Sequence, residues 1–357
     1  MGRNIKRGLV FTVLVMCMVL SPLSLLANTN GRNDTVGSEA FDDSPPSDWS
    51  TLAGQPSQDD ESGAWITRRE MPARQMGLNI MGDMPMITPA FGAAHTFINQ
   101  RIDDIAEELI AEARRMRGRS VTFTYGISST PTMVSIVIHG SISSAIYRTL
   151  VRSVNFCPYT GAIFTVRDAM GVDIVPLATR ILEERMRRSP EHFYALPSVS
   201  MGNQAFFMTE DSIIILFDEF QLSSMVSGVF PLELRQSNIR TASISPDMLL
   251  PTHHAYQLMM VPLRTVAEQL GYEVGLTAST GRINVWRGAP DEDNLVAWMY
   301  AGANEYHALG FVQSLESAPF NRGGRNYVPI TFFERILPLT VYHVDSFGNI
   351  TFLAYSA

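Results

Sequence analysis

The sequence has almost no lysine and very little cysteine. Lys6 is its only lysine, and Cys17 and Cys157 are its only cysteines, in 357 residues. Without a lysine beyond the first few residues, the folded chain has no Schiff-base amine and no phosphate-loop lysine. Because Cys17 falls in an N-terminal apolar run, Cys157 has no partner for an internal disulfide. Cys157 ends the strand-like run AIYRTLVRSVNFC, so it is interpreted as a buried packing thiol rather than a reactive one.

Motifs for catalysis and for metal binding are also absent. No G-x-S-x-G motif occurs, and none of the seven histidines stands in HExxH or HxH spacing. His253 and His254 are adjacent in a proline-flanked loop, where a metal site is the less favoured interpretation, and His139 is interpreted as a core-edge residue. We expect no catalytic residue, no metal, no cofactor and no enzyme activity. A glycosidase-type carboxylate pair stays open, because 35 acidic residues offer many pairings.

The first 27 residues have the pattern of a secretory signal peptide. Arg3, Lys6 and Arg7 precede an apolar run that begins at Leu9 and ends at the small residue Ala27. An uncleaved anchor is the alternative, since the run approaches the about 20 residues that span a bilayer. We expect an extracellular or cell-surface protein that contacts the membrane only through this segment, if it is not cleaved.

The composition of residues 28–83 predicts a disordered acidic linker. They are rich in Asp, Ser, Gly and Pro, and such a stretch cannot bury enough apolar surface to offset its ordering entropy. Removal of residues 1–27 takes away three basic residues and no acidic one, so the formal net charge changes from −8 to −11. This charge argues against nucleic acid and against anionic membranes or wall polymers, and it favours a cationic partner.

Residues 84–235 predict an α+β domain of antiparallel sheet packed with helices. One long amphipathic helix is expected over 94–119, because apolar side chains recur at steps of three and four residues. These side chains are Ile98, Ile102, Ile105, Leu109, Ala113 and Met116. A second helix is expected over 173–188, and runs rich in β-branched residues predict about six strands.

Three stretches of this domain carry a family resemblance: PMITPAFGAAHTFINQRI, VNFCPYTGAIFTVRDAM and AFFMTEDSIIILFDEFQLSSMVSGVFPLEL. Their order resembles the extracellular domain of RsiV-type anti-sigma factors, which is shared with an accessory domain of some peptidoglycan deacetylases. The resemblance implies an extracellular binding domain, with lysozyme as a possible ligand. Phe217, Phe220 and Gln221 lie in the matching motif and are the candidates for ligand contact. Where the family has Pro-Tyr-Glu, this chain has Glu219-Phe220-Gln221, so the family's tyrosine hydroxyl and the carboxylate that follows it are absent. With only eight residues before the apolar run, we do not expect an anti-sigma factor.

Residues 240–357 contain an internal repeat. The stretch VPLRTVAEQLGYEVGLTASTGRINV, residues 261–285, aligns without a gap with VPITFFERILPLTVYHVDSFGNITF, residues 328–352. Each copy predicts a helix after Val-Pro and then a hairpin with a glycine turn at Gly281 or Gly348. One helix on one hairpin leaves an apolar face uncovered, so the two copies are expected to share a core. The pattern resembles the N-terminal repeat domain of copper amine oxidases, which implies a non-catalytic module.

Trp286, Trp298 and Tyr300 could form a sugar-stacking platform, but their strand spacing favours core positions. The leading functional hypothesis is a secreted or surface-associated bacterial protein that binds or senses a lysozyme-like protein or a cell-wall component. The alternatives are a structural or assembly component of the envelope and, less favoured, a wall-active hydrolase or deacetylase.

Overall fold

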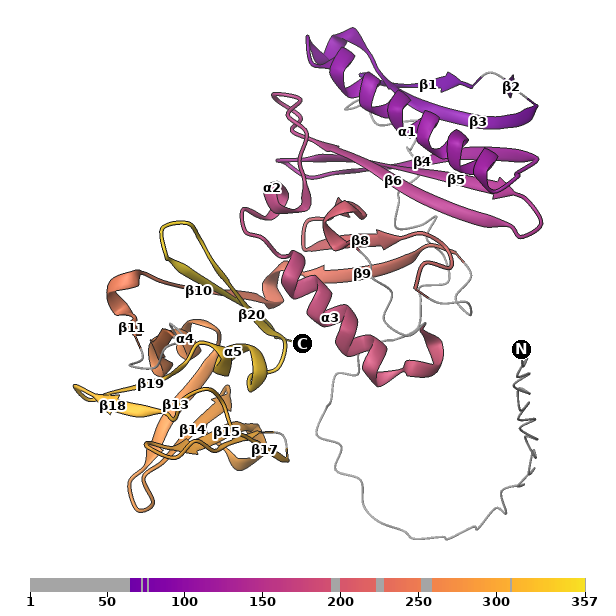
Figure 1. Cartoon of the computed structure of the whole chain (residues 1–357). Helices are drawn as coiled ribbons and strands as arrows, with labels where there is room; N and C mark the ends of the chain where they lie inside the picture. The colour runs from indigo at the N-terminus through magenta and orange to yellow at the C-terminus, as the bar shows by residue number, and fades with distance from the viewer. Residues whose placement is uncertain are drawn as a thin grey trace, which may run out of the picture. The chain divides into compact units, whose positions relative to one another are not determined.

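The computed structural model describes residues 65–71, 73–75, 77–193, 200–222, 228–251, 259–308 and 310–356 (Figure 1). By internal contacts the chain divides into residues 1–42 and 43–357, and every described residue belongs to the second unit. Mostly antiparallel sheets alternate with a few helices, which confirms the α+β class. In this part of the chain no helix is long and apolar enough to cross a bilayer. The predicted signal peptide, most of the predicted linker and His253–His254 lie outside the described residues.

The N-terminal half is built on one large sheet. Its strands are β1 (Ile66–Glu70), β2 (Arg74–Gln75), β3 (Leu78–Ile87), β4 (Ser120–Ser129), β5 (Val134–Ser143) and β6 (Arg148–Phe156). The order is β1-β3-β4-β5-β6, with β2 paired to the start of β3. Only β3 and β4 run parallel, and a helix connects them, as a parallel pair requires.

That helix, α1 (His95–Arg115), covers one face of the sheet (Figure 1). The predicted stripe is confirmed, because Ile98, Ile102 and Ile105 are fully buried and Met116 packs at the edge of the same core. The close approach of the helix to β5 depends on Gly140, where a Cβ atom would lie 3.2 Å from Leu109 Cδ1.

Strand β1 lies within the range expected to be linker and β3 begins within it, so the predicted boundary at residue 83 is too late. Leu78 and Ile80 alternate with exposed residues and are buried on the core face. Just before β1, the Trp65 ring lies 5.0 Å from that of Phe91, which in turn contacts Phe156. A few apolar residues at period two are enough to order this stretch, although its overall composition is polar.

A second, smaller sheet packs on the opposite face of the large sheet. It contains β7 (Ala205–Met208), β8 (Ser212–Phe217) and β9 (Phe230–Arg235) in that order. Val137 and Val151 of the large sheet share a core with Phe207 and Leu216. The short helix α2 (Val166–Met170) and α3 (Val175–Arg188) precede this sheet, and α3 confirms the predicted second helix.

The C-terminal half confirms the predicted repeat. The first copy is β12 (Met259–Pro262), α4 (Leu263–Gln269), β13 (Tyr272–Thr277) and β14 (Arg282–Arg287). The second copy is β19 (Arg325–Pro329), α5 (Thr331–Arg335), β20 (Thr340–Val344) and β21 (Ile350–Tyr355). The two Val-Pro motifs pair with each other, since Val261 lies directly opposite Val328. Gly281 and Gly348 have the positive φ that the hairpin turns need.

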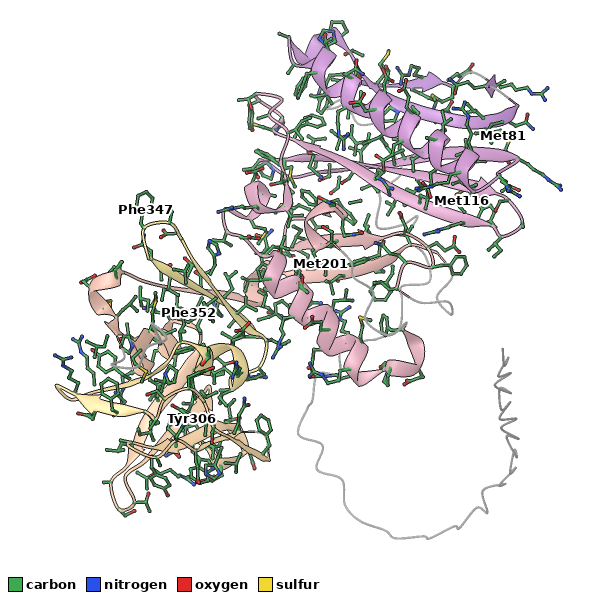
Figure 2. The ribbon with its side chains drawn as sticks, viewed as in Figure 1. Met81, Met116, Met201, Tyr306, Phe347 and Phe352 are labelled. Atoms are coloured by element: carbon green, nitrogen blue, oxygen red, sulfur yellow. The ribbon has the colours of Figure 1, made fainter. Side chains whose placement is uncertain are left out.

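Each hairpin gains a third strand from outside its own copy. β10 (Ile239–Ile244) pairs with β21, and β15 (Leu295–Tyr300) pairs with β14. The core between the copies contains residues of both, among them Leu263, Val266, Phe332 and Phe352. Tyr306 and Phe352, labelled in Figure 2, are fully buried there. The shared core that the repeat predicts is therefore present.

Candidate functional site: an aromatic sheet face

The sheet that contains the first-copy hairpin, β13 and β14, continues beyond β15 and exposes an aromatic surface on one face. β16 (Tyr306–Ala308) and β17 (Phe311–Gln313) extend it to the order β13-β14-β15-β16-β17. Ile283, Val285 and Met299 point into the core. Side chains alternate between faces along a strand, so the residues between them lie on the other face. We call Trp286, Trp298, Tyr300, His307 and Asn284 the aromatic face.

Trp298 is the best-fixed ring of the aromatic face. His307 lies opposite it on β16 and stacks flat against it, with ring centroids 3.5 Å apart and planes 7° apart. The Arg282 guanidinium carbon lies 5.6 Å from the Trp298 centroid, in a cation–π position. Trp298 is partly buried and has a neighbour stacked on its ring, so this side chain orients its neighbours as well as contributing to the surface.

Trp286 and Tyr300 are the more available rings. Tyr300 contacts Trp298 edge-on at 5.6 Å and is 37% exposed. Trp286 extends over Gly275 of β13, where an added Cβ atom would meet the indole at 2.8 Å. Gly275 is therefore required for Trp286 to lie against the sheet, and this contact orients the indole.

Asn284 is a buried polar residue within the aromatic face. Asn284 pairs with Gly275 on β13 and with Trp298 on β15, and it is 1% exposed. Its Nδ2 donates to Thr277 Oγ1 at 2.9 Å. Its Oδ1 has no hydrogen-bond partner in the structure. An unpaired buried acceptor costs about 1–3 kcal/mol, so a ligand or water donor that reached this oxygen would be favoured.

Charged groups of both signs border the aromatic face. Arg282 donates to Glu292 Oε1 at 2.8 Å, and His307 Nε2 lies 4.0 Å from Glu305 Oε2. Rings, an amide and paired charges together suit a ligand with apolar faces and a hydroxyl-rich rim. The sequence interpretation of Trp286, Trp298 and Tyr300 as core residues is wrong, because Ile283, Val285 and Met299 take the core positions of these strands.

The predicted ligand candidates lie elsewhere, in a turn that caps the free edge of β6. Asp218 Oδ1 accepts from the Val151 N–H at 2.7 Å, and Glu219 Oε2 accepts from the Thr149 N–H at 2.7 Å. Gln221 Oε1 accepts from the Asp218 N–H at 2.9 Å. Carboxylates that fill edge-strand donors block further strand pairing, so this motif has a structural role that the sequence did not reveal.

Phe217 is fully buried at the end of β8, so it offers no surface to a ligand in this structure. Phe220 adopts a positive φ of 62° and is partly exposed, as is Gln221. Ligand contact at Phe220 and Gln221 stays a prediction.

Cys157 is not the buried packing thiol that the sequence favours. It is partly exposed at the start of a tight turn. Hydrogen bonds from the Thr160 hydroxyl and from the backbone N–H groups of Tyr159 and Thr160 lower the pKa of its thiol. The strand pattern missed this, because β6 ends one residue earlier, at Phe156.

His139 lies between the two N-terminal sheets. Burial lowers the pKa of its imidazole. It borders a cavity of about 30 Å³ together with Val137, Phe207 and Leu216. This volume suits one or two water molecules and is far too small for a metabolite. Among the described residues no group of three His, Cys, Asp or Glu side chains is placed to hold a metal.

Comparisons with known proteins match parts of this chain. The copper amine oxidase N-terminal domain model matches residues 248–350, which supports the resemblance stated for the C-terminal half. A curated protein from Brevibacillus choshinensis, named "Protease inhibitor", is 33% identical over 89 residues. That match spans 25% of this chain and 26% of the relative, so about three quarters of the relative lies outside it.

Two solved structures of DUF3298 family proteins are similar to about half of the chain. One is from Pseudomonas aeruginosa, with 12% identity, a TM-score of 0.30, and coverage of 48% of this chain and 88% of that one. The other is from Bacteroides fragilis, with 10% identity, a TM-score of 0.32, and coverage of 48% and 89%. The match to the copper amine oxidase N-terminal domain model is limited to residues 248–350.

Proposed function

We propose that this protein is a non-catalytic binding protein that acts outside a bacterial cell and recognises a cell-wall glycan through the aromatic face. The observation that carries the proposal is the set of Trp286, Trp298 and Tyr300 rings held on the outer face of one sheet. Export would depend on residues 1–27. Residues 28–64 would then serve as a tether, with the two halves divided between residues 235 and 240.

A glycan fits the chemistry of the aromatic face. Sugar rings have apolar C–H faces that pack on indole and phenol rings, and hydroxyl groups around their rims. Arg282 and Glu292 supply a donor and an acceptor beside the rings. The net charge of −8 disfavours polyanionic ligands and leaves neutral sugars unaffected.

A protein ligand is the second candidate. The acidic net charge favours a cationic partner such as a lysozyme-like protein. The Brevibacillus relative carries the name of a protease inhibitor, so inhibition of proteases belongs among the assays. This candidate requires no role for the aromatic face.

The test is calorimetric titration of the protein with N-acetylglucosamine oligomers, together with co-sedimentation with purified peptidoglycan. Trp286→Ala and Tyr300→Ala should each weaken binding by about tenfold or more, which corresponds to about 1.4 kcal/mol, a typical contribution of one stacked aromatic residue. Phe347→Ala is the matched control, because Phe347 is 84% exposed at the β20–β21 turn (labelled in Figure 2) and lies off the aromatic face.

Retention of full binding by both aromatic-face variants would overturn the glycan proposal. Binding of lysozyme, unaffected by Trp286→Ala and weakened by salt, would support the protein candidate instead.

A further inference from the structure

One end of the N-terminal sheet concentrates positive charge in a chain that is acidic overall. The strand register places the ends of β2 to β6 side by side. Asn79 pairs with both Arg74 and Ser120. Ser120 pairs with Ser143, and Ile142 pairs with Arg148. Helix α1 also ends here, and Figure 2 labels Met81 and Met116 at this end. We define the arginine end as Arg74, Arg114, Arg115, Arg117, Arg119 and Arg148, with Met81, Ile146 and Tyr147.

The balance of charge at the arginine end is strongly positive. Residues 73–82, 112–122 and 140–149 contain six arginines and a single acidic residue, Glu112. Glu112 pairs with Arg115. The Glu219 carboxylate reaches this end from its turn, but it is bonded to the backbone N–H groups of Thr149 and Gly228.

Most of these arginines are free to meet a ligand. Arg74, Arg114, Arg117 and Arg119 are exposed, and none has an ion pair in the part of the chain that the structure describes. Guanidinium groups bind phosphate through two parallel hydrogen bonds. Groups that stay unpaired at one end of an otherwise acidic molecule fit a ligand that carries several phosphates.

Arg117 stands where a helix end ordinarily has glycine. The Gly118 N–H bonds to the Ala113 carbonyl and the Arg117 N–H bonds to the Arg114 carbonyl, which is the Schellman arrangement. Arg117 has a positive φ of 54°, in the left-handed region that disfavours side chains. The chain therefore retains a charged side chain at a position where glycine would be more stable.

Exposed apolar residues accompany the arginines. Ile146 is 66% exposed, Tyr147 60% and Met81 49%. Ile146 and Tyr147 lie at the tip of the β5–β6 hairpin, which the Ser144 hydroxyl holds by donating to the Ile146 carbonyl at 2.6 Å. A soluble polyanion offers nothing apolar for such a tip, whereas a bilayer offers an acyl boundary beneath its phosphates.

We propose that the arginine end docks on the surface of an anionic lipid bilayer, with Ile146 and Tyr147 entering the interface and the arginines contacting lipid phosphates. Tyrosine is favoured at that depth, and each arginine near an anionic surface strengthens binding. The acidic net charge does not prevent this, because charges separated by more than a Debye length of about 8–10 Å are largely screened.

The test is co-sedimentation of the full chain with vesicles of phosphatidylcholine alone, and of phosphatidylcholine and phosphatidylglycerol in equal parts. All variants share the apolar run of residues 9–27, so binding to the neutral vesicles measures that common background. Arg114→Gln, Arg117→Gln and Arg119→Gln combined should reduce binding to the anionic vesicles by about tenfold or more. Arg264→Gln, Arg322→Gln and Arg325→Gln combined are the matched control, because they remove the same charge from exposed sites in the C-terminal half and should leave binding unchanged.

Arg117→Gly separates binding from folding. It removes one charge and relieves the left-handed strain, so it should raise or maintain the melting temperature while it weakens binding to anionic vesicles several-fold. Ile146→Ser with Tyr147→Ser should weaken the same binding even at high salt, where electrostatic attraction is screened.

Two results would overturn the proposal. One is equal binding of the wild type and the triple glutamine variant to anionic vesicles. The other is binding to a soluble polyphosphate that depends on the arginines, with vesicle binding unaffected by the Ile146 and Tyr147 substitutions, which would identify a soluble polyanion as the ligand.

Discussion

The two large sheets of this protein differ in how many of their faces are used for packing. The N-terminal sheet is covered by α1 on one face and by β7–β9 on the other. The five-stranded sheet of the C-terminal half buries one face against the repeat core and carries a partly exposed aromatic face on the other. A sheet covered on both sides can bind a partner only at an end or an edge, whereas a half-covered sheet can bind through a face. The two proposals follow this difference.

The largest effect is expected where the N-terminal sheet is most completely covered. Ile102 of α1 is fully buried in its core. Ile102→Ala removes several methyl and methylene groups and leaves a cavity, so it should lower the free energy of unfolding by about 2–5 kcal/mol. Chemical denaturation would measure the loss, and Ala111→Ser on the exposed side of the same helix is the control. A loss below about 1 kcal/mol would mean that the helix packs more loosely than described.

The repeat offers a comparison between two copies of one motif. Val261 and Val328 face each other across β12 and β19, and both are fully buried. Each substitution to alanine should lower the free energy of unfolding by about 1–3 kcal/mol, from lost burial and an unfilled cavity. Because the residues are in contact, the double variant should differ from the sum of the single variants by about 0.5 kcal/mol or more. A double-mutant cycle measures this term, and strict additivity would contradict the direct pairing of the two copies.

Much of the fold could be predicted from the spacing of apolar residues, because each helix or hairpin concerned buries only one of its faces. The stripe of Ile98, Ile102 and Ile105 specified α1, and the Val-Pro copies specified the shared core. The orientation of β14 and β15 could not be read in the same way. Val285 and Trp286 are adjacent and both apolar, so alternation identifies two faces without saying which one meets the core. The outcome depended on which set fits between the two copies, and the smaller residues Ile283, Val285 and Met299 take that place.

Amino-acid composition placed the end of the linker too late, because it was averaged over too long a stretch of sequence. Residues 66–87 follow a polar, acidic segment, so the few apolar residues that order β1 and β3 were not separated from it. Net charge is also a sum over the whole chain, so a value of −8 gave no indication that six arginines lie at one end of a sheet. The capping role of Asp218 and Glu219 was also beyond the sequence, because the strand donors that they meet are about 70 residues away in the chain.

The smallest effect is expected at the turns of the two repeat hairpins, where one copy has a carboxylate acceptor and the other has none at the aligned position. Asp345 of the second copy accepts hydrogen bonds from the Phe347 N–H at 2.8 Å and the Asn349 N–H at 2.9 Å, and Ala278 stands at the aligned position of the first copy. The Asn349 side-chain amide and these backbone donors lower the pKa of the Asp345 carboxyl. A lowered pKa means that the ionised form stabilises the folded state, so this contribution is complete at neutral pH and is lost as the pH falls below the ordinary value of 3.8.

Asp345→Ala should therefore lower the melting temperature slightly at pH 7 and lower it less near pH 2, where protonation of the wild-type carboxyl weakens this contribution. Ala278→Asp tests the reciprocal change, since it adds a carboxylate to a first-copy turn in which the Thr280 hydroxyl already accepts from the Arg282 N–H at 3.3 Å. Any gain in melting temperature should appear at pH 7 alone. Thermal melts of both variants at the two pH values measure the difference. A loss for Asp345→Ala that is equal at both pH values would show that the side chain acts through packing, and the contrast between the two turns would then have no electrostatic part.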